Sequence, residues 1–323
     1  MSRKLSSGRF RLASSVSGAR RKQSEQSAEI AGVKLSHPNR ILYSEQGITK
    51  RELAEYYVQV ADWILPHVQG RPLTLVRCPR GLQAQCFYQR NAEDGIPQTI
   101  RRFPLRAGKS VKPAMVIDSL AGLIALVQMG VLEIHTWGST VKRIERPDRI
   151  TFDLDPAPEL PWKIVRRATG NLRDLLSDLD LDAFVKTTGG KGLHVVVPIK
   201  PTLDWEQAKA FAKAVAQSMA AAAPDLYVAT MSKSKRAGRI FIDYLRNARS
   251  ATAICAYSTR AHAGAPVAAP LRWDELKSDV RHEYFTIRNL PARLRSLRKD
   301  PWHDYESARR PITASVRKRL RVA

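Results

Sequence analysis

The sequence contains little cysteine, no long apolar run and few acidic residues. Its 323 residues include three cysteines, Cys78, Cys86 and Cys255, an odd number without paired spacing. A disulfide framework or a cysteine-rich zinc site is therefore not expected, and this usage fits a reducing cytosol. No apolar stretch approaches the roughly 18–20 residues of a membrane span, and no apolar segment of about 7–15 residues follows the basic N-terminus. These absences predict a soluble intracellular protein without a membrane partner.

Basic residues are abundant by contrast. The chain has 54 Lys and Arg against 30 Asp and Glu, a net charge of +24. Residues 1–30 carry seven basic and two acidic residues, and residues 291–323 carry ten and three, which leaves +12 on residues 31–290. A folded body this basic either binds a polyanion or tolerates self-repulsion, so the charge favours a nucleic-acid partner over a merely cationic surface.

The chain is predicted to contain one large folded region with basic ends. Residues 1–29, rich in Ser, Arg, Lys and Gln, are predicted to be a flexible basic arm or linker. Residues 30–310 are predicted to form the folded domain, and residues 311–323 a basic C-terminal tail. Thr49 and Glu52 have the spacing of a capping box before a helix that runs to about Ile64. Asp118 is predicted to cap a second helix that ends near Met129.

The pattern is sharper from residue 150 onward. Its hydrophobic periods predict, in order, a strand over 150–154, a helix over 162–179, strands over 183–187 and 193–199, a helix over 205–222 and a strand over 239–244. This β-α-β-β-α-β order is that of a ferredoxin-like split unit, which RNA-recognition domains also use. We therefore predict an α+β fold in which this unit packs against an N-terminal α/β half. In such a unit the strand over 239–244 lies beside the strand over 150–154, which lies beside the strand over 193–199.

Three acidic residues are candidates for a metal site. Asp153 and Asp155 are two residues apart on one strand, so both carboxylates point to the same face. Two such close carboxylates favour a hard divalent cation, although a surface turn or a sugar-nucleotide transferase also explains an isolated Asp-x-Asp. Asp243 lies on the strand predicted to pair beside Asp153, and burying an acid there is unfavourable unless it is paired or metal-bound. An ion pair with Arg239 or Arg246 is the alternative explanation.

A glycine-rich segment, Thr188-Gly189-Gly190-Lys191-Gly192-Leu193-His194, joins two of the predicted strands. It lacks the spacing of the nucleotide-binding P-loop. Its glycines would nevertheless allow backbone N–H groups to converge on an anion beside the Lys191 ammonium. We predict a triphosphate site here, and a plain hairpin turn is the alternative.

The three motifs together resemble a known family. Asp153-Leu-Asp155-Pro, the glycine segment and Ile-Asp243-Tyr-Leu-Arg246-Asn are similar to the motifs of the archaeo-eukaryotic primase superfamily, and most closely to the polymerase domain of bacterial ligase D. The resemblance covers about residues 30–310 and implies the primase-polymerase fold. It implies a template-directed polymerase that adds ribonucleotides, less readily deoxyribonucleotides, to 3′ ends at DNA breaks or gaps in non-homologous end joining.

The resemblance also implies roles for individual residues. Asp153, Asp155 and Asp243 would hold two ions of Mn²⁺, or Mg²⁺, and serve as the catalytic residues. Positions that bind the NTP or dNTP or complete the site in the family are matched here by His135, Thr188, Gly189, Gly190, Lys191, His194, Arg246 and Arg260. The family commonly has Ser where Thr188 stands, which keeps the hydroxyl. His135 taken alone is as readily a structural histidine.

A second region would recognise the 5′-phosphate across a gap. The family motif is matched by His37-Pro-Asn39-Arg40 and Lys50, with Arg40 standing where the family usually has Lys. Lys50 is predicted to lie in the first turn of the helix capped by Thr49, where free N–H groups and the helix dipole favour an anion. Phe87 and Tyr88 are candidates to stack on a template base, with a core anchor as the alternative.

The implied partners are broken or gapped DNA, nucleotides, a DNA ligase domain or protein and a Ku-type end-binding protein, in the cytoplasm of a bacterium near its nucleoid. No ligase signature of the Lys-x-Asp-Gly type occurs in the sequence, so sealing would fall to another protein or domain. Two alternatives remain open, a primase of the same superfamily that starts strands without a primer, and a non-catalytic module that bridges DNA ends.

Overall fold

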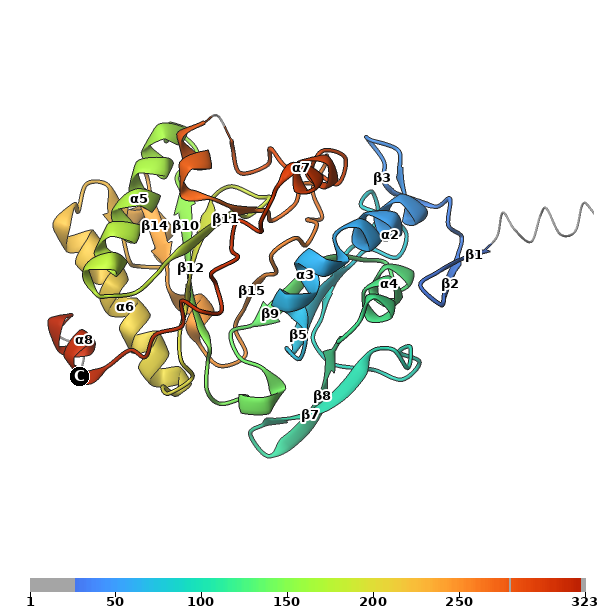
Figure 1. The fold of residues 1–323 in the computed structure, drawn as a ribbon, viewed down its shortest axis with the longest axis horizontal. Helices are drawn as coiled ribbons and strands as arrows, with labels where there is room; N and C mark the ends of the chain where they lie inside the picture. Colours follow the sequence, from blue (N-terminus) through green and yellow to red (C-terminus); the bar gives the residue numbers. More distant parts are fainter. Residues whose placement is uncertain (1–26, 279, 321–323) are drawn as a thin grey trace, which may run out of the picture.

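Two β-sheets lie at the centre of the molecule, with helices on their outer sides (Figure 1). The computed structural model describes residues 27–278 and 280–320. The larger sheet has the strand order β13 (Tyr227–Val228), β14 (Ile240–Asp243), β10 (Arg149–Pro156), β12 (Leu193–Pro198), β11 (Phe184–Thr187) and β16 (Pro270–Leu271). The smaller sheet has the order β15 (Thr252–Ile254), β9 (Val131–Trp137), β5 (Leu73–Arg77) and β6 (Phe87–Gln89).

Three hairpins and seven α-helices in the described residues complete the fold. The hairpins are β1 (Ser27–Ile30) with β2 (Val33–Ser36), β3 (Ile41–Tyr43) with β4 (Ile48–Thr49), and β7 (Arg101–Ala107) with β8 (Ser110–Val116). The helices are α2 (Lys50–Gln59), α3 (Ala61–Val68), α4 (Leu120–Gln128), α5 (Trp162–Asp178), α6 (Trp205–Ala222), α7 (Leu290–Ser296) and α8 (Ala314–Arg319). Short 3₁₀ turns are η1 (Val141–Arg143), η2 (Lys233–Lys235), η3 (Leu245–Asn247) and η4 (Trp273–Lys277). None of the helices in this part of the chain combines the length and the apolar character that crossing a membrane requires.

The larger sheet confirms the predicted split unit. Its central strands follow the order β14-β10-β12-β11, and every neighbouring pair among them is antiparallel. Helices α5 and α6 cover its outer face (Figure 1). A capping box starts α6, in which Asp204 accepts a hydrogen bond from the Gln207 amide and the Gln207 side chain accepts one from the Asp204 amide.

Strand alternation divides the larger sheet into an apolar face and a polar face. Phe152 and Leu154 of β10 are fully buried in the core beneath α5 and α6, together with Phe211 of α6. Burial of a phenylalanine of this kind contributes about 1.5–3 kcal/mol. Because successive side chains of a strand point to opposite faces, Asp153 and Asp155 point away from this core. We call their side of the sheet the inner face, since it is turned toward the smaller sheet.

The N-terminal half differs in detail from its prediction. The predicted helix to Ile64 is two helices, α2 and α3, which meet at Val60. Both contribute apolar side chains to the core, namely Leu53, Tyr56, Tyr57 and Ile64. Thr49 and Glu52 form the predicted capping box. Ser119, rather than Asp118, caps α4 by accepting a hydrogen bond from the Gly122 amide. Asp118 instead pairs with Arg101, with 2.9 Å between Oδ2 and Nη2, so the acid that was predicted as a cap serves the β7–β8 hairpin.

The predicted ends of the chain are partly described. Residues 1–26 of the predicted arm lie outside the described residues, and β1 already begins at Ser27, before the predicted boundary at residue 30. Residues 321–323 of the predicted tail also lie outside them. The rest of that tail contains α8, and Ile312 and Val316 are buried against the core beneath α5 and α6. This segment is therefore part of the fold because it contributes apolar side chains to that core.

Candidate active site

A cleft of about 360 Å³ lies on the inner face of the larger sheet, next to β9 and β15 of the smaller sheet. Its lining includes predicted residues that are far apart in the sequence. They come from the N-terminal half, from β10 and β12, and from the glycine segment. The predicted residues that line it are Tyr88, His135, Asp153, Asp155, Thr188, Gly190, Lys191, His194, Arg246 and Arg260.

The three acidic residues lie on neighbouring strands, as predicted. Asp153 of β10 and Asp243 of β14 are direct partners in the antiparallel register. Arg246 joins them, since its Nη2 lies 3.1 Å from Asp153 Oδ2 and its Nε lies 3.3 Å from Asp243 Oδ2. A shared guanidinium requires both carboxylates to be on the same face. The predicted alternative, an ion pair between Asp243 and Arg246, is thus present together with the predicted juxtaposition.

The environments of the three carboxyls differ. Burial would raise the pKa of Asp153, but His194 and Arg246 hold that pKa well below its usual range. Burial raises the pKa of Asp155, and the neighbouring charge of Asp153 raises it further. Burial also raises the pKa of Asp243, against the opposing effect of Arg246. Two of the three carboxyls therefore carry negative charge that the cations of the protein do not fully neutralise.

The carboxylates suit a divalent cation by their chemistry. Hard oxygen ligands suit Mg²⁺ and Mn²⁺, and such an ion would relieve the unfavourable burial of Asp155 and Asp243. Within residues 27–278 and 280–320, however, no group of three or more His, Cys, Asp or Glu side chains is arranged to hold a metal ion as it stands. Arg246 lies between two of the three acids, so the side-chain positions described here are those of an ion-paired cluster.

The glycine segment is a tight turn held by Thr188. The Thr188 hydroxyl accepts hydrogen bonds from the amides of Gly190 and Gly192 and donates one to the Gly192 carbonyl oxygen. Gly189 has a φ of +63°, and a Cβ at Gly192 would lie 2.0 Å from the Leu154 carbonyl oxygen, so both positions require glycine.

The predicted cradle of backbone amides is therefore wrong at these three glycines. The Gly189 amide donates to the His282 carbonyl oxygen, and the other two amides are taken by Thr188. Folding places the Thr188 hydroxyl and the His282 carbonyl oxygen next to these amides, and their sequence separation gives no sign of this. The positive charge at this part of the cleft comes instead from the side chains of Lys191 and Arg260.

Behind the cleft, His135 and Arg260 converge on one buried acid, Glu133. His135 Nε2 lies 2.7 Å from Glu133 Oε2, and Arg260 Nε lies 3.0 Å from Glu133 Oε1. Arg260 also donates a hydrogen bond of 3.0 Å to the Thr188 carbonyl oxygen. His194 approaches Asp153, with 3.4 Å between Nε2 and Oδ1. The predicted nucleotide-binding side chains are thus held in place by acids of the two sheets.

The predicted 5′-phosphate residues lie away from this cleft, around the start of α2. The first-turn amides are not free, which makes that part of the prediction wrong: the Lys50 amide donates to the Arg40 carbonyl oxygen, and the Arg51 amide to the Pro38 carbonyl oxygen. Lys50 Nζ is buried and donates to Ser36 O and Gln128 Oε1. Burial lowers the pKa of Lys50 to about 8. His37 and Arg40 are exposed on the same loop.

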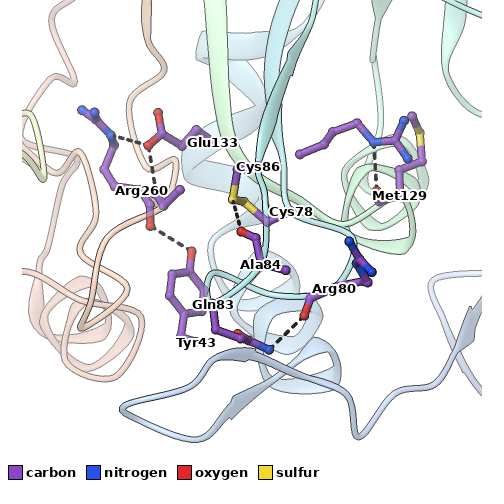
Figure 2. The surroundings of a disulfide bond; sticks show 11 residues. Tyr43, Cys78, Arg80, Gln83, Ala84, Cys86, Met129, Glu133 and Arg260 are labelled. Atoms are coloured by element: carbon purple, nitrogen blue, oxygen red, sulfur yellow. Dashed lines mark hydrogen bonds and ion pairs between the residues drawn. A yellow bond between two sulfur atoms is a disulfide. The ribbon is translucent and has the colours of Figure 1, made fainter.

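Phe87 and Tyr88 are exposed, at 44% and 70%, so they are not core anchors. They belong to β6, which pairs with β5 at the edge of the smaller sheet. The residue before them, Cys86, forms a disulfide with Cys78 at the end of β5 (Figure 2). The expectation that these cysteines are unpaired is wrong. Antiparallel pairing of β5 with β6 brings the two residues to a Cα–Cα distance of 4.4 Å, which their spacing of eight residues does not reveal.

The chain was compared with models of known protein families. The family model for the LigD primase-polymerase domain matches residues 49–302. The chain belongs to this family. The match includes every predicted residue of the cleft and of the carboxylate cluster, and Lys50, and it leaves out His37 and Arg40.

Relatives and a solved structure agree with the family. The chain is 41% identical over 296 residues to the multifunctional non-homologous end joining protein LigD of Pseudomonas aeruginosa, covering 91% of this chain and 35% of that protein. It is 34% identical to the LigD protein of Mycolicibacterium smegmatis, covering 78% and 34%. The chain thus spans about a third of the length of these relatives. The polymerase domain of Mycobacterium tuberculosis ligase D, solved in complex with DNA, superposes with a TM-score of 0.80 at 30% identity, covering 85% of this chain and 98% of that one. This confirms the predicted primase-polymerase fold.

Two residues of this LigD family member were missed from the sequence. Glu133 lies two residues before His135 on β9, and strand alternation could have placed both on one face. Asn247 is buried, accepts a hydrogen bond from the Thr151 amide and donates one to the Thr151 carbonyl oxygen. It fixes η3, and thus Arg246, to β10. No signal in a single sequence marks this second role.

Proposed function

We propose that the chain is a template-directed nucleotidyltransferase that adds ribonucleotides, and less readily deoxyribonucleotides, to 3′ ends at DNA breaks or gaps. The observation that carries the proposal is the pairing of Asp153 with Asp243 across two strands, with Asp155 on the same face, and the cation-rich cleft that Asp153 and Asp155 line. Family membership supports the same class of reaction, since the matching model is that of a primase-polymerase domain.

In this proposal the three carboxylates hold two Mn²⁺ or Mg²⁺ ions. When bound, such ions neutralise charge on the reacting phosphates and lower the pKa of the attacking hydroxyl. Because Arg246 now joins Asp153 and Asp243, we expect it to leave at least one of them and turn toward the nucleotide phosphates. Arg246 would then exchange one anionic partner for another, which keeps its charge compensated.

The remaining cleft residues would bind and orient the nucleotide. Lys191 and Arg260 supply positive charge at the glycine turn, and His135 lies beside them. Asp243, the acid on β14, is proposed to activate the primer hydroxyl, whose pKa the bound ions would lower. Tyr88 at the mouth of the cleft, with Phe87 before it, offers an exposed aromatic surface on which a template base can stack.

Recognition of the downstream 5′-phosphate is proposed for the loop before α2. His37 and Arg40 are exposed there, and Lys50 lies buried behind them. Because the first-turn amides are occupied, the binding would come from side-chain charge and not from the helix end. The guanidinium of Arg40 donates one hydrogen bond to the Pro79 carbonyl oxygen, which leaves further N–H groups to bind a phosphate.

The proposed setting is repair of double-strand breaks by non-homologous end joining, in the bacterial cytoplasm and close to the nucleoid. Relatives that carry the LigD name are described as multifunctional or bifunctional in end joining and are much longer than this chain. We therefore propose a DNA ligase domain or protein and a Ku-type end-binding protein as partners of this chain.

The test is nucleotide incorporation on a gapped duplex, with and without the downstream 5′-phosphate, in Mn²⁺ and in Mg²⁺. The Asp153→Ala/Asp155→Ala variant should lose extension and keep most of its DNA affinity. Asp174→Ala/Asp178→Ala removes the same charge from the exposed side of α5 and is the matched control. Extension by the first variant would refute the assignment. Failure of the wild-type chain to extend, with tight salt-sensitive binding to 5′-phosphorylated ends, would favour an end-bridging module.

A further inference from the structure

A single buried carboxylate, that of Glu133, connects the two sides of the cleft. Its exposed fraction is 4%, and both of its oxygens have partners. Oε2 contacts His135 Nε2 on the same strand. Oε1 forms an ion pair with Arg260 and accepts a hydrogen bond of 2.9 Å from the Ala261 amide. One acid of the smaller sheet thus binds two cleft residues, of which the second is 127 positions away in the sequence.

Arg260 continues this connection into the glycine turn. Its guanidinium donates to the Thr188 carbonyl oxygen. A Cβ at Gly189 would lie 2.8 Å from Arg260 Cγ, so the turn packs directly on the arginine stem. The main chain of Arg260 has partners of its own, because its carbonyl oxygen accepts from the Tyr43 hydroxyl (Figure 2). Its amide donates to the Pro266 carbonyl oxygen. Glu133 thus contacts the guanidinium, which Thr188 also binds, and the amide of the next residue, Ala261.

We propose that Glu133 is a positioning residue, which orients His135 and Arg260 toward the phosphates of the bound nucleotide. This inference rests on the proposed function. Glu133 itself is not among the residues that line the cleft, so it acts through its two partners. Burial would raise the pKa of Glu133, but the bonds from His135 and the charge of Arg260 hold that pKa at about 2, so the carboxylate is ionised at neutral pH.

The physical reason is preorganisation. Without the carboxylate, the nucleotide itself would have to order Arg260 and His135. The free energy spent on ordering these two side chains would be lost from the free energy of nucleotide binding. Loss of the acid would also remove the hydrogen-bond partner of His135 Nε2 and of the Ala261 amide, and the counter-charge of Arg260. The effect should appear in nucleotide affinity, because Glu133 does not reach the carboxylate cluster that would carry out the chemical step.

The experiment compares Glu133→Gln with Glu275→Gln in the full chain. Glu275 is a matched control, since it too is a little-exposed acid that pairs with an arginine. Its partner is Arg293, at 2.8 Å, and neither residue lines the cleft. Binding of a fluorescent ATP analogue with Mn²⁺ is measured without DNA, and KM and kcat are measured on the gapped duplex. We expect Glu133→Gln to raise the Kd and KM for nucleotide about 10- to 100-fold, with kcat changed less than about threefold. Glu275→Gln should change neither constant.

A variant background provides the second readout. If Glu133 acts through its partners, Glu133→Gln should raise the Kd less than about twofold in the His135→Ala/Arg260→Met background, since coupled residues are not additive. Where Glu133→Gln does not fold, Glu133→Asp replaces it, because the acid keeps its charge but is one methylene too short to reach both partners. We expect the same loss of affinity from it.

The outcomes separate the two proposals. Equal ATP affinity of the Glu133 and Glu275 variants, or full additivity in the variant background, overturns the positioning role and leaves the proposed function intact. A wild-type chain that binds the ATP analogue but never extends a primer overturns the proposed function, while the change in Kd still tests Glu133. Absence of ATP binding by the wild-type chain overturns the positioning role.

Discussion

The disulfide between Cys78 and Cys86 should stabilise the fold measurably. It joins the end of β5 to the residue before β6, across a sequence separation of eight. Replacing Cys86 with Ser breaks the link and leaves the pairing of β5 with β6 to hold this edge of the sheet. Cys86 is the better site for the change, because Cys78 is fully buried and Cys86 is partly exposed.

The size of the effect follows from loop closure. A crosslink that closes a loop of about eight or nine residues lowers the entropy of the unfolded chain by an amount worth about 2–3 kcal/mol at 25 °C. For a domain of about 290 residues, whose unfolding entropy is about 2.1 cal/mol/K per residue, that change in the free energy of unfolding corresponds to a fall in melting temperature of about 3–5 °C.

The assay is thermal unfolding followed by circular dichroism, with and without a phosphine reductant. Cys86→Ser should melt lower than the wild-type chain in oxidising buffer and equal to it in reductant. Cys255→Ala removes the buried free thiol, which lies outside the loop, and should respond to reductant as the wild type does.

Two observations would refute this reasoning. One is a wild-type melting temperature that does not change in reductant. The other is a thiol titration of the unfolded wild-type chain, without reductant, that finds three reactive thiols per chain instead of the one that the disulfide leaves free.

Two further predictions concern buried polar side chains. His67 packs edge-on against Trp302 at 5.4 Å between ring centroids, and burial lowers the pKa of His67 to about 3. The unfolded chain therefore binds a proton at His67 more tightly than the folded chain does. The stability that neutral His67 contributes is fully present above about pH 6.5 and falls as the pH drops. His67→Phe should reduce the loss of unfolding free energy between pH 7 and pH 5, measured in urea, by about 2 kcal/mol, and an unchanged loss would contradict this. Asn247→Ala leaves the buried amide and carbonyl of Thr151 unpaired and should lower the free energy of unfolding, measured in urea, by about 2–3 kcal/mol. A change as small as that of the exposed control Asn91→Ala would be contrary evidence.

The half of the chain from residue 150 onward was predictable because its signals are local. Alternation in β10 places Asp153 and Asp155 on the face opposite Phe152 and Leu154, and helical periodicity marks α5 and α6. The connection order then limits how the strands can pair and predicts Asp243 beside Asp153, which the register of β10 with β14 confirms. The glycine segment was marked by its own composition, the resemblance to ligase D added His135, and the family match confirms that resemblance.

Partners brought together by folding were out of reach of the sequence. The glycine amides and the first-turn amides of α2 look free in a sequence, yet folding supplies Thr188, His282, Arg40 and Pro38 as acceptors. The pairs Glu133–Arg260 and Cys78–Cys86 likewise depend on how strands and loops meet. Periodicity reports which face a side chain occupies, because that is fixed by its own backbone; which atom it meets there is fixed by another segment of the chain. The sequence by itself therefore determined the acids, their common face and the fold, and the tertiary structure alone decided which donors stay available to a ligand.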